Sequence, residues 1–119
     1  MTSVFANTFY WVALTSTEDA GHEFALSLSH SIKPARIVTT DEVLVEHLAF
    51  FAGARSSVRA QAASNVLDLI RNTGVWVVPQ SRDSFMAGLE RYRARPDKHY
   101  SLTDCISMQM MRKEGITEA

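Results

Sequence analysis

The stretch RIVTTDEVLVEHLAFF, residues 36–51, joins a short β-branched run directly to a helical pattern. Arg36–Thr39 is typical of a short buried strand. Thr39 precedes Glu42 by three residues, which is the spacing of a capping box, so we expect Thr39 to open a helix over Asp41–Phe51. A strand that leads straight into a helix is the repeating unit of an α/β fold with a parallel sheet.

The same alternation continues on both sides of this unit. Ser3–Ala6 predicts a first strand, after which Asn7-Thr8 caps an apolar turn at Phe9–Leu14, and Val75–Val78 predicts a third strand. This order predicts a parallel sheet covered by helices on both faces. The other predicted helices run from Ser16 or Thr17 to about Lys33-Pro34, from Ser56 or Ser57 to Asn72-Thr73-Gly74, from Ser81 to about Ala94, and from Ser101 to Gly115.

Composition bounds the class of protein. The 119 residues are 46% hydrophobic and 21% charged, which is typical of one globular domain and excludes disorder and coiled coil, so we expect a single domain over residues 1–119. No apolar run reaches the roughly 18 residues of a membrane span. Cys105 is the only cysteine, so no internal disulfide can form, and we expect a cytoplasmic protein.

The net charge of −1, from 12 basic and 13 acidic residues, conceals an uneven distribution. Residues 1–54 hold two basic and six acidic side chains, whereas residues 55–98 hold eight basic and four acidic ones. This pattern is consistent with a metal site beside a phosphate-binding surface. The alternative is two solvated faces with no binding role.

The carboxyl ends of the predicted strands indicate where a site would form. Ligands of open parallel sheets bind at these ends, which here are Asn7-Thr8, Thr40-Asp41 and Pro79-Gln80. The sequence shows no zinc-type spacing of histidines with Cys105, no glycine-rich phosphate loop and no hydrolase nucleophile motif.

Glu46 is the most informative acid, because its helix is apolar nearly all round. Such a helix is mostly buried, and a buried carboxylate is costly unless it is paired or binds a metal. The alternative is that Glu46 emerges at a polar seam with Glu42 and His47.

Two further residues have both a structural and a functional interpretation. Asp104 follows Ser101 by three residues, as the acid of a helix cap does, but its helix face also carries Ser107. Asn7 is suited to a helix cap, and its amide oxygen is also able to bind a hard cation.

Basic residues cluster near the end of the helix that Ser81 opens. Arg91, Arg93, Arg95 and Lys98 are candidates for binding phosphate. The alternative is a solvated helix end, since cations are favourable at a helix C-terminus.

Four stretches together resemble one known family: VFANTFYWVAL (4–14), IVTTDEVLVEHLAFFA (37–52), VWVVP (75–79) and DKHYSLTDCISMQMMRKEGITEA (97–119). They are similar to the PIN-domain family and, within it, to the VapC-like ribonuclease toxins and their unassigned bacterial relatives. The resemblance implies an α/β fold, a three-layer α/β/α sandwich with a short central parallel sheet.

The resemblance also implies an acidic site that holds Mg²⁺ or Mn²⁺ and cuts RNA with an activated water. By position, Glu46 matches the second acid of the family and Asp104 the third, while Thr8 and Ser107 match its nearby hydroxyls. The resemblance thus gives Asn7, Glu46 and Asp104 as the candidate catalytic and metal-ligating residues, with Thr8 and Ser107 in support. The family further implies a small antitoxin partner and a homodimer.

Two departures from the family pattern bear on activity. The first acid, an aspartate, is replaced here by Asn7, which removes one negative charge and is expected to weaken metal binding and activity. In the family GITEA runs into a further strand and a fourth acid, whereas this sequence stops at Ala119, so we expect that strand to be truncated. The leading prediction is a metal-dependent endoribonuclease toxin with impaired activity. The alternatives are an inactive PIN-like module that binds RNA or protein, and a structural α/β domain without a site.

Overall fold

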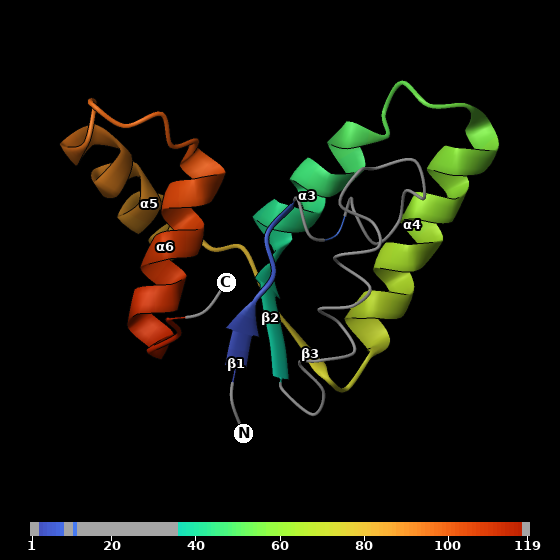
Figure 1. Cartoon of the computed structure of the whole chain (residues 1–119), viewed down its shortest axis with the longest axis horizontal. Helices are drawn as coiled ribbons and strands as arrows, with labels where there is room; N and C mark the ends of the chain where they lie inside the picture. The colour runs from blue at the N-terminus through green and yellow to red at the C-terminus, as the bar shows by residue number, and fades with distance from the viewer. Residues whose placement is uncertain (1–2, 9–10, 12–35, 118–119) are drawn as a thin grey trace.

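The computed structural model describes residues 3–8, 11 and 36–117 (Figure 1). Their centre is a three-stranded parallel sheet with the strand order β1-β2-β3. Val4 of β1 pairs with Ile37 of β2, and Val38 of β2 pairs with Trp76 of β3. The predicted parallel sheet is therefore confirmed. The strands are β1 (Ser3–Phe5), β2 (Arg36–Thr40) and β3 (Val75–Val78).

The described helices follow the predicted order. The helix pair α3 and α4 and the pair α5 and α6 lie on opposite sides of the strands (Figure 1). The helices predicted over Phe9–Leu14 and from Ser16 or Thr17 to Lys33-Pro34 fall almost wholly outside the described residues. The helices are α3 (Asp41–Phe50), α4 (Ser56–Arg71), α5 (Arg82–Ala94) and α6 (Leu102–Glu114).

The start of α3 differs from the prediction by one residue. Thr40, not Thr39, is the N-cap, and its Oγ1 accepts a hydrogen bond of 3.1 Å from the Val43 N–H. The Thr39 hydroxyl is already engaged, because it donates to the Ala6 carbonyl at 2.9 Å and accepts from Trp11 Nε1 at 3.2 Å. Thr39 therefore ties the end of β2 to the segment after β1 rather than capping the helix.

The predicted ends of α5 and α6 are confirmed. Ser81 caps α5 in a reciprocal pair with Ser84, and Ser101 caps α6 in the same way with Asp104. Gly115 ends α6 with a φ of 68°, a left-handed conformation that glycine adopts without strain.

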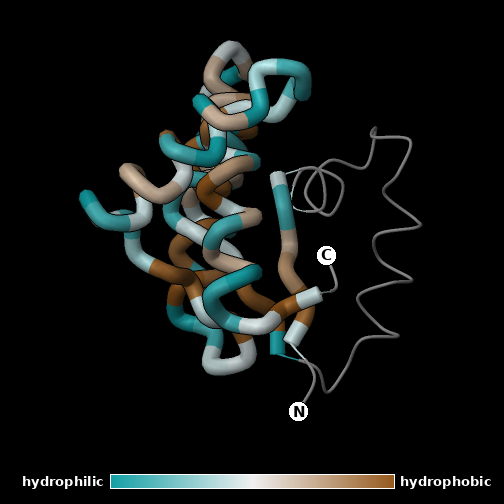
Figure 2. The backbone as a smooth tube through the Cα atoms, turned by 90° about the vertical axis from the view of Figure 1, so that its left-hand side faces the viewer, coloured by the Kyte–Doolittle hydropathy of each residue, from teal (hydrophilic) through white to brown (hydrophobic). Residues whose placement is uncertain are grey.

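The core lies where α3, α6 and the sheet meet, and Figure 2 shows hydrophobic segments inside and hydrophilic ones on outer turns. The expectation that α3 is buried nearly all round is wrong, because Val45 and Phe50 are 64% and 63% exposed. The buried residues of α3 are Val43, Leu44 and His47. None of the helices in the described part of the chain is long and apolar enough to cross a membrane.

The helices α5 and α6 pack tightly against each other. A Cβ built on Gly88 of α5 would lie 2.4 Å from Ile106 Cγ1 of α6, so this position requires the absence of a side chain. Arg91 of α5 is half-buried and donates a hydrogen bond of 2.8 Å to Gln109 of α6. These contacts hold α6, which carries Asp104, against α5.

Candidate functional site

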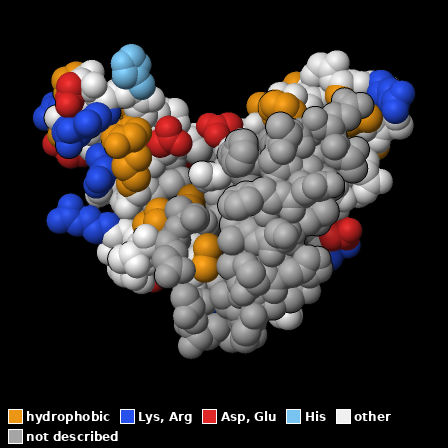
Figure 3. All heavy atoms as spheres, viewed as in Figure 1, with side chains coloured by type: hydrophobic (Ala, Val, Ile, Leu, Met, Phe, Trp, Pro, Cys, Tyr) orange, Lys and Arg blue, Asp and Glu red, His pale blue; other side chains and the backbone are white. Residues whose placement is uncertain are grey.

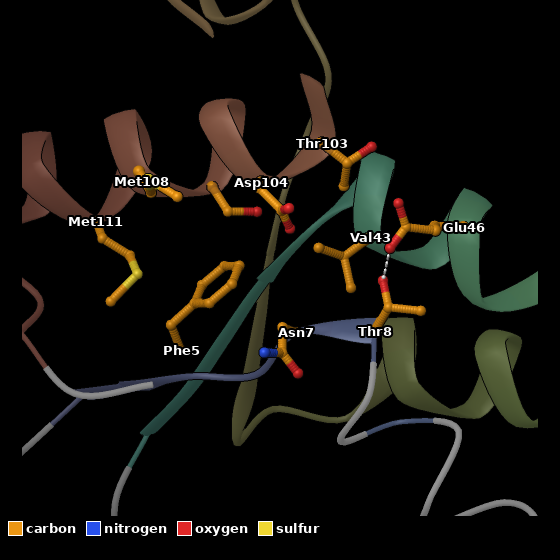
Figure 4. A pocket seen from close by; sticks show the side chains of 10 residues that line it. Phe5, Asn7, Thr8, Val43, Glu46, Thr103, Asp104, Met108 and Met111 are labelled. Carbon is orange, nitrogen blue, oxygen red and sulfur yellow. Dashed lines mark hydrogen bonds between the residues drawn. The ribbon is translucent and has the colours of Figure 1, made fainter. Parts of the chain in front are cut away.

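A pocket of about 360 Å³ opens between α3, α6 and the chain that leaves β1 (Figure 4). In the space-filling view of Figure 3, acidic side chains stand at the edge of the notch between the two helical sides. All five residues expected at the site line this pocket, namely Asn7, Thr8, Glu46, Asp104 and Ser107. The other lining residues are Phe5, Val43, Thr103, Met108 and Met111.

Parallel strand pairing carries Asn7 and Thr8 to this place. Beyond the last residue of β1, the Ala6 N–H still donates to the Val38 carbonyl at 2.9 Å, so the chain stays beside β2. The buried Thr39 hydroxyl fixes the Ala6 carbonyl on the same side. The next two residues therefore emerge at the carboxyl edge of the sheet, opposite the first turns of α3.

Thr8 and Glu46 form a short hydrogen bond in the site. Thr8 Oγ1 donates a hydrogen bond of 2.5 Å to Glu46 Oε1, a length typical of a hydroxyl that donates to a carboxylate. Glu46 is half-buried, so the paired interpretation of this acid fits the structure. The polar seam with His47 does not form, because His47 points into the core and is only 2% exposed.

Asp104 combines the two roles proposed for it. Its Oδ2 accepts a hydrogen bond of 3.0 Å from the Ser101 N–H, and its own N–H donates to Ser101 Oγ at 3.0 Å. The same side chain also lines the pocket, with Ser107 one turn further along α6. The cap thus fixes the Asp104 carboxylate at the start of α6. The other carboxylate oxygen, Oδ1, makes no hydrogen bond to the described residues.

The donor set fits a hard divalent cation. Figure 4 shows Glu46 on the α3 wall and Asp104 on the α6 wall, with Asn7 on the β1 side. Two carboxylates, one amide and two hydroxyls offer only oxygen, the ligand type that Mg²⁺ and Mn²⁺ prefer. In the described ranges, no three His, Cys, Asp or Glu side chains lie close enough to share a metal. The site therefore offers two negative charges, because its third position carries the amide of Asn7.

Asp41 and Gln80, which follow β2 and β3, stabilise the fold and do not line the pocket. Asp41 Oδ2 accepts a hydrogen bond of 2.9 Å from the Gln80 N–H, which joins the ends of β2 and β3. Both residues follow strands, so the strand-end rule pointed to them, but neither lines the pocket. Met108 and Met111 share the helix face of Asp104 and Ser107 by spacing and also line the pocket, whereas Thr103 was not expected there.

His47 is a buried titratable group next to the site. Its Nδ1 makes no hydrogen bond to any described residue, and its ring meets the edge of Phe51 at a centroid distance of 5.3 Å. Burial lowers the pKa of His47, because the charged imidazolium loses its hydration. The folded protein therefore favours a neutral His47.

The four basic candidates lie along α5 and the connection to α6, outside the 360 Å³ pocket. Arg91 differs from the others, since its bond to Gln109 gives it a structural role. Arg93 lies 3.7 Å from Glu90, and both side chains are exposed. Arg95 makes two 3.2 Å hydrogen bonds to Asp97, which hold the pKa of Asp97 below its usual range, and Lys98 is exposed.

Comparison with known proteins identifies relatives of this chain. No protein-family profile matches it. It is 32% identical over 116 residues to the 23S rRNA-specific endonuclease VapC20 from two strains of Mycobacterium tuberculosis, an alignment that covers 98% of this chain and 86% of VapC20. It also resembles the crystal structure of M. tuberculosis VapC20, described as a Sarcin-Ricin loop cleaving toxin. That match has a TM-score of 0.81 and 30% identity, and it covers 95% of this chain and 84% of the other.

Proposed function

Because this chain belongs to the PIN-domain family of VapC-like ribonuclease toxins, we propose that it is a metal-dependent endoribonuclease that cuts RNA at the pocket between α3 and α6. One observation carries the proposal. Glu46 and Asp104, which lie far apart in sequence, line the same pocket, and each carboxylate is held by a hydrogen bond. Oriented carboxylates at one opening are what a divalent metal site requires.

Each residue has a distinct part in the proposed reaction. Glu46, Asp104 and the Asn7 amide oxygen would hold Mg²⁺ or Mn²⁺, which would activate a water and stabilise charge on the phosphate oxygens. The Thr8 hydroxyl fixes one oxygen of Glu46 and leaves the other to the pocket. The Ser101 N–H likewise holds one oxygen of Asp104 and leaves the other oxygen to the pocket. Holding the carboxylates in advance avoids the cost of ordering them when the cation and RNA arrive.

The relatives suggest the class of RNA and the partners. VapC20 is a 23S rRNA-specific endonuclease, so 23S rRNA with its sarcin–ricin loop is the first substrate to test. As in other VapC toxins, a small antitoxin would neutralise the enzyme, and we propose that it acts in the cytoplasm as a homodimer.

Asn7 sets the expected level of activity. An amide at this position leaves the site with two negative charges, and weaker cation binding follows from the lost attraction. We therefore propose that this chain cuts RNA weakly. The same observation favours the second candidate function, an inactive PIN-like module that binds RNA or protein without cutting.

The test compares the chain with Asn7→Asp on 23S rRNA fragments in Mn²⁺ and in EDTA. We expect Asn7→Asp to raise Mn²⁺-dependent cleavage by at least about tenfold, and Asp104→Asn in that background to remove it. Asp68→Asn is the matched control, because Asp68 is an exposed acid on α4 that lies outside the pocket. RNA binding by Asn7→Asp without cleavage would favour the inactive module. Cleavage that survives both EDTA and Asp104→Asn would contradict the metal site.

A further inference from the structure

A second pocket lies behind the start of α6, on the side that faces α5. Its volume is about 530 Å³, within the range of about 300–1,000 Å³ that ligand sites occupy. The last turn of α5 and the connection to α6 form its walls, and the buried Cys105 of α6 contributes to its floor. This pocket shares no lining residue with the one that holds Glu46 and Asp104.

Two aromatic rings and three cations line this second pocket. Tyr92 and Tyr100 are 52% and 42% exposed, so part of each ring is open to a ligand. The cations are Arg93, Arg95 and Lys98, and none of the lining residues is acidic. In Figure 3, hydrophobic and basic side chains gather on the side of the molecule formed by α5 and α6.

The cations remain available to a phosphate. The pairs Arg93–Glu90 and Arg95–Asp97 are exposed, and exposed pairs contribute little stability, so a phosphate is able to compete with their carboxylates. Lys98 makes no ion pair with the described residues. Aromatic rings beside free cations are the combination by which proteins bind single-stranded nucleic acid, with bases stacked on the rings and phosphates held by the cations.

The position of the second pocket ties it to the proposed cleavage site. Asp104 lines the first pocket and Cys105, the next residue, lines the second. Their Cα atoms are about 3.8 Å apart, the fixed spacing of a trans peptide. The first turn of α6 therefore contributes to both pockets.

We propose that this second pocket binds one unpaired nucleotide of the RNA substrate, with its base stacked on Tyr92 or Tyr100 and its phosphate held by Arg93 and Lys98. The inference rests on the proposed function in one respect, that RNA is the substrate. It adds that the enzyme selects RNA in which a base is free to leave its helix, because a base inside a duplex has no exposed face for the rings.

The test measures binding in EDTA, so that the metal site makes no contribution. A labelled single-stranded RNA oligonucleotide and the same sequence as a full duplex are titrated with the protein by fluorescence anisotropy. We expect Tyr92→Leu or Tyr100→Leu to weaken single-strand binding about tenfold and to leave duplex binding unchanged. Phenylalanine at the same position keeps the flat ring and should restore binding. We expect Lys98→Gln to lower the slope of log affinity against log salt by about 0.7.

Matched controls lie elsewhere on the surface. Phe50→Leu removes an exposed ring on α3, and Lys113→Gln removes an exposed lysine at the far end of α6. Circular dichroism confirms that each variant is folded. Equal binding by the wild type and both leucine variants, or equal losses in the leucine and phenylalanine variants, would overturn the inference. If a leucine variant instead changed the oligomeric state in light scattering, the pocket would belong to a protein interface.

The two proposals fail in different ways. Cleavage of RNA by Asn7→Asp with no effect of the tyrosine variants would overturn the nucleotide pocket alone. A wild-type chain that binds neither RNA nor Mn²⁺ would overturn the proposed function and the pocket together.

Discussion

Thr8 donates a hydrogen bond to Glu46 across 38 residues of sequence, from the end of β1 to the second turn of α3. Residues that hold a metal ligand in place typically change metal affinity or activity by about 10–100-fold when they are replaced. We expect Thr8→Val, which keeps the shape and removes the donor, to lower the Mn²⁺ affinity of Asn7→Asp by about tenfold in calorimetry. Thr117→Val changes an exposed threonine outside the pocket and should have no effect. An unchanged affinity in Thr8→Val would show that this bond does not support cation binding.

Gly88 should not tolerate a side chain. A methyl group there would meet Ile106 at 2.4 Å and the Ile106 backbone at 3.1 Å, so α5 and α6 would have to separate. We expect Gly88→Ala to lower the free energy of unfolding by about 1–3 kcal/mol, measured by urea denaturation. Gly53→Ala is the control, because a Cβ at Gly53 meets nothing within 4 Å. Equal stabilities of the two variants would show that α5 yields at this contact.

The cap and the pocket roles of Asp104 are separable through Ser101. Ser101→Ala removes the hydroxyl that accepts from the Asp104 N–H, while the Ser101 N–H that holds the carboxylate remains. We expect a loss of about 1 kcal/mol in the free energy of unfolding, with Mn²⁺ affinity unchanged. We expect Asp104→Asn to act mainly on Mn²⁺ affinity, with a smaller effect on the free energy of unfolding. A large affinity loss in Ser101→Ala would mean that the hydroxyl itself takes part in the site.

His47 should make the fold less stable in acid. Its pKa is lowered in the folded protein, so below about pH 6.5 the unfolded chain binds a proton that the folded chain does not. The stability that neutral His47 contributes is complete above that pH. It is lost as the pH falls toward the pKa that His47 has in the folded protein. We expect the melting temperature to fall over this window and to fall less in His47→Leu. His99→Gln changes an exposed histidine and should retain the wild-type slope.

Local signals predicted much of the fold. The cap residues Ser81 and Ser101 and the stop at Gly115 act within one turn of their helices, so sequence spacing was sufficient to find them. The strand Val75–Val78 was found for the same reason, since its apolar run is bounded by Gly74 and Pro79.

Tertiary contacts decided what the sequence left open. Spacing favoured Thr39, which precedes Glu42 by three residues, but the bonds of Thr39 to Ala6 and Trp11 leave the cap to Thr40. The exposure of Val45 likewise depends on how little packs outside α3. For the site, spacing within one helix placed Asp104 and Ser107 on one face. The meeting of Asp104 with Glu46 was expected only from the family resemblance.

The shortness of β1 has a consequence for the local stability of the site. The three residues Ser3–Phe5 pair with β2, and the segment that follows them positions Thr8 against Glu46. Short edge strands open locally at a lower free energy than global unfolding requires. We therefore expect the amides of β1 to exchange at a lower free energy than those of α5 and α6, and the Thr8–Glu46 bond to open with β1. Hydrogen exchange measures this local stability separately from the melting temperature.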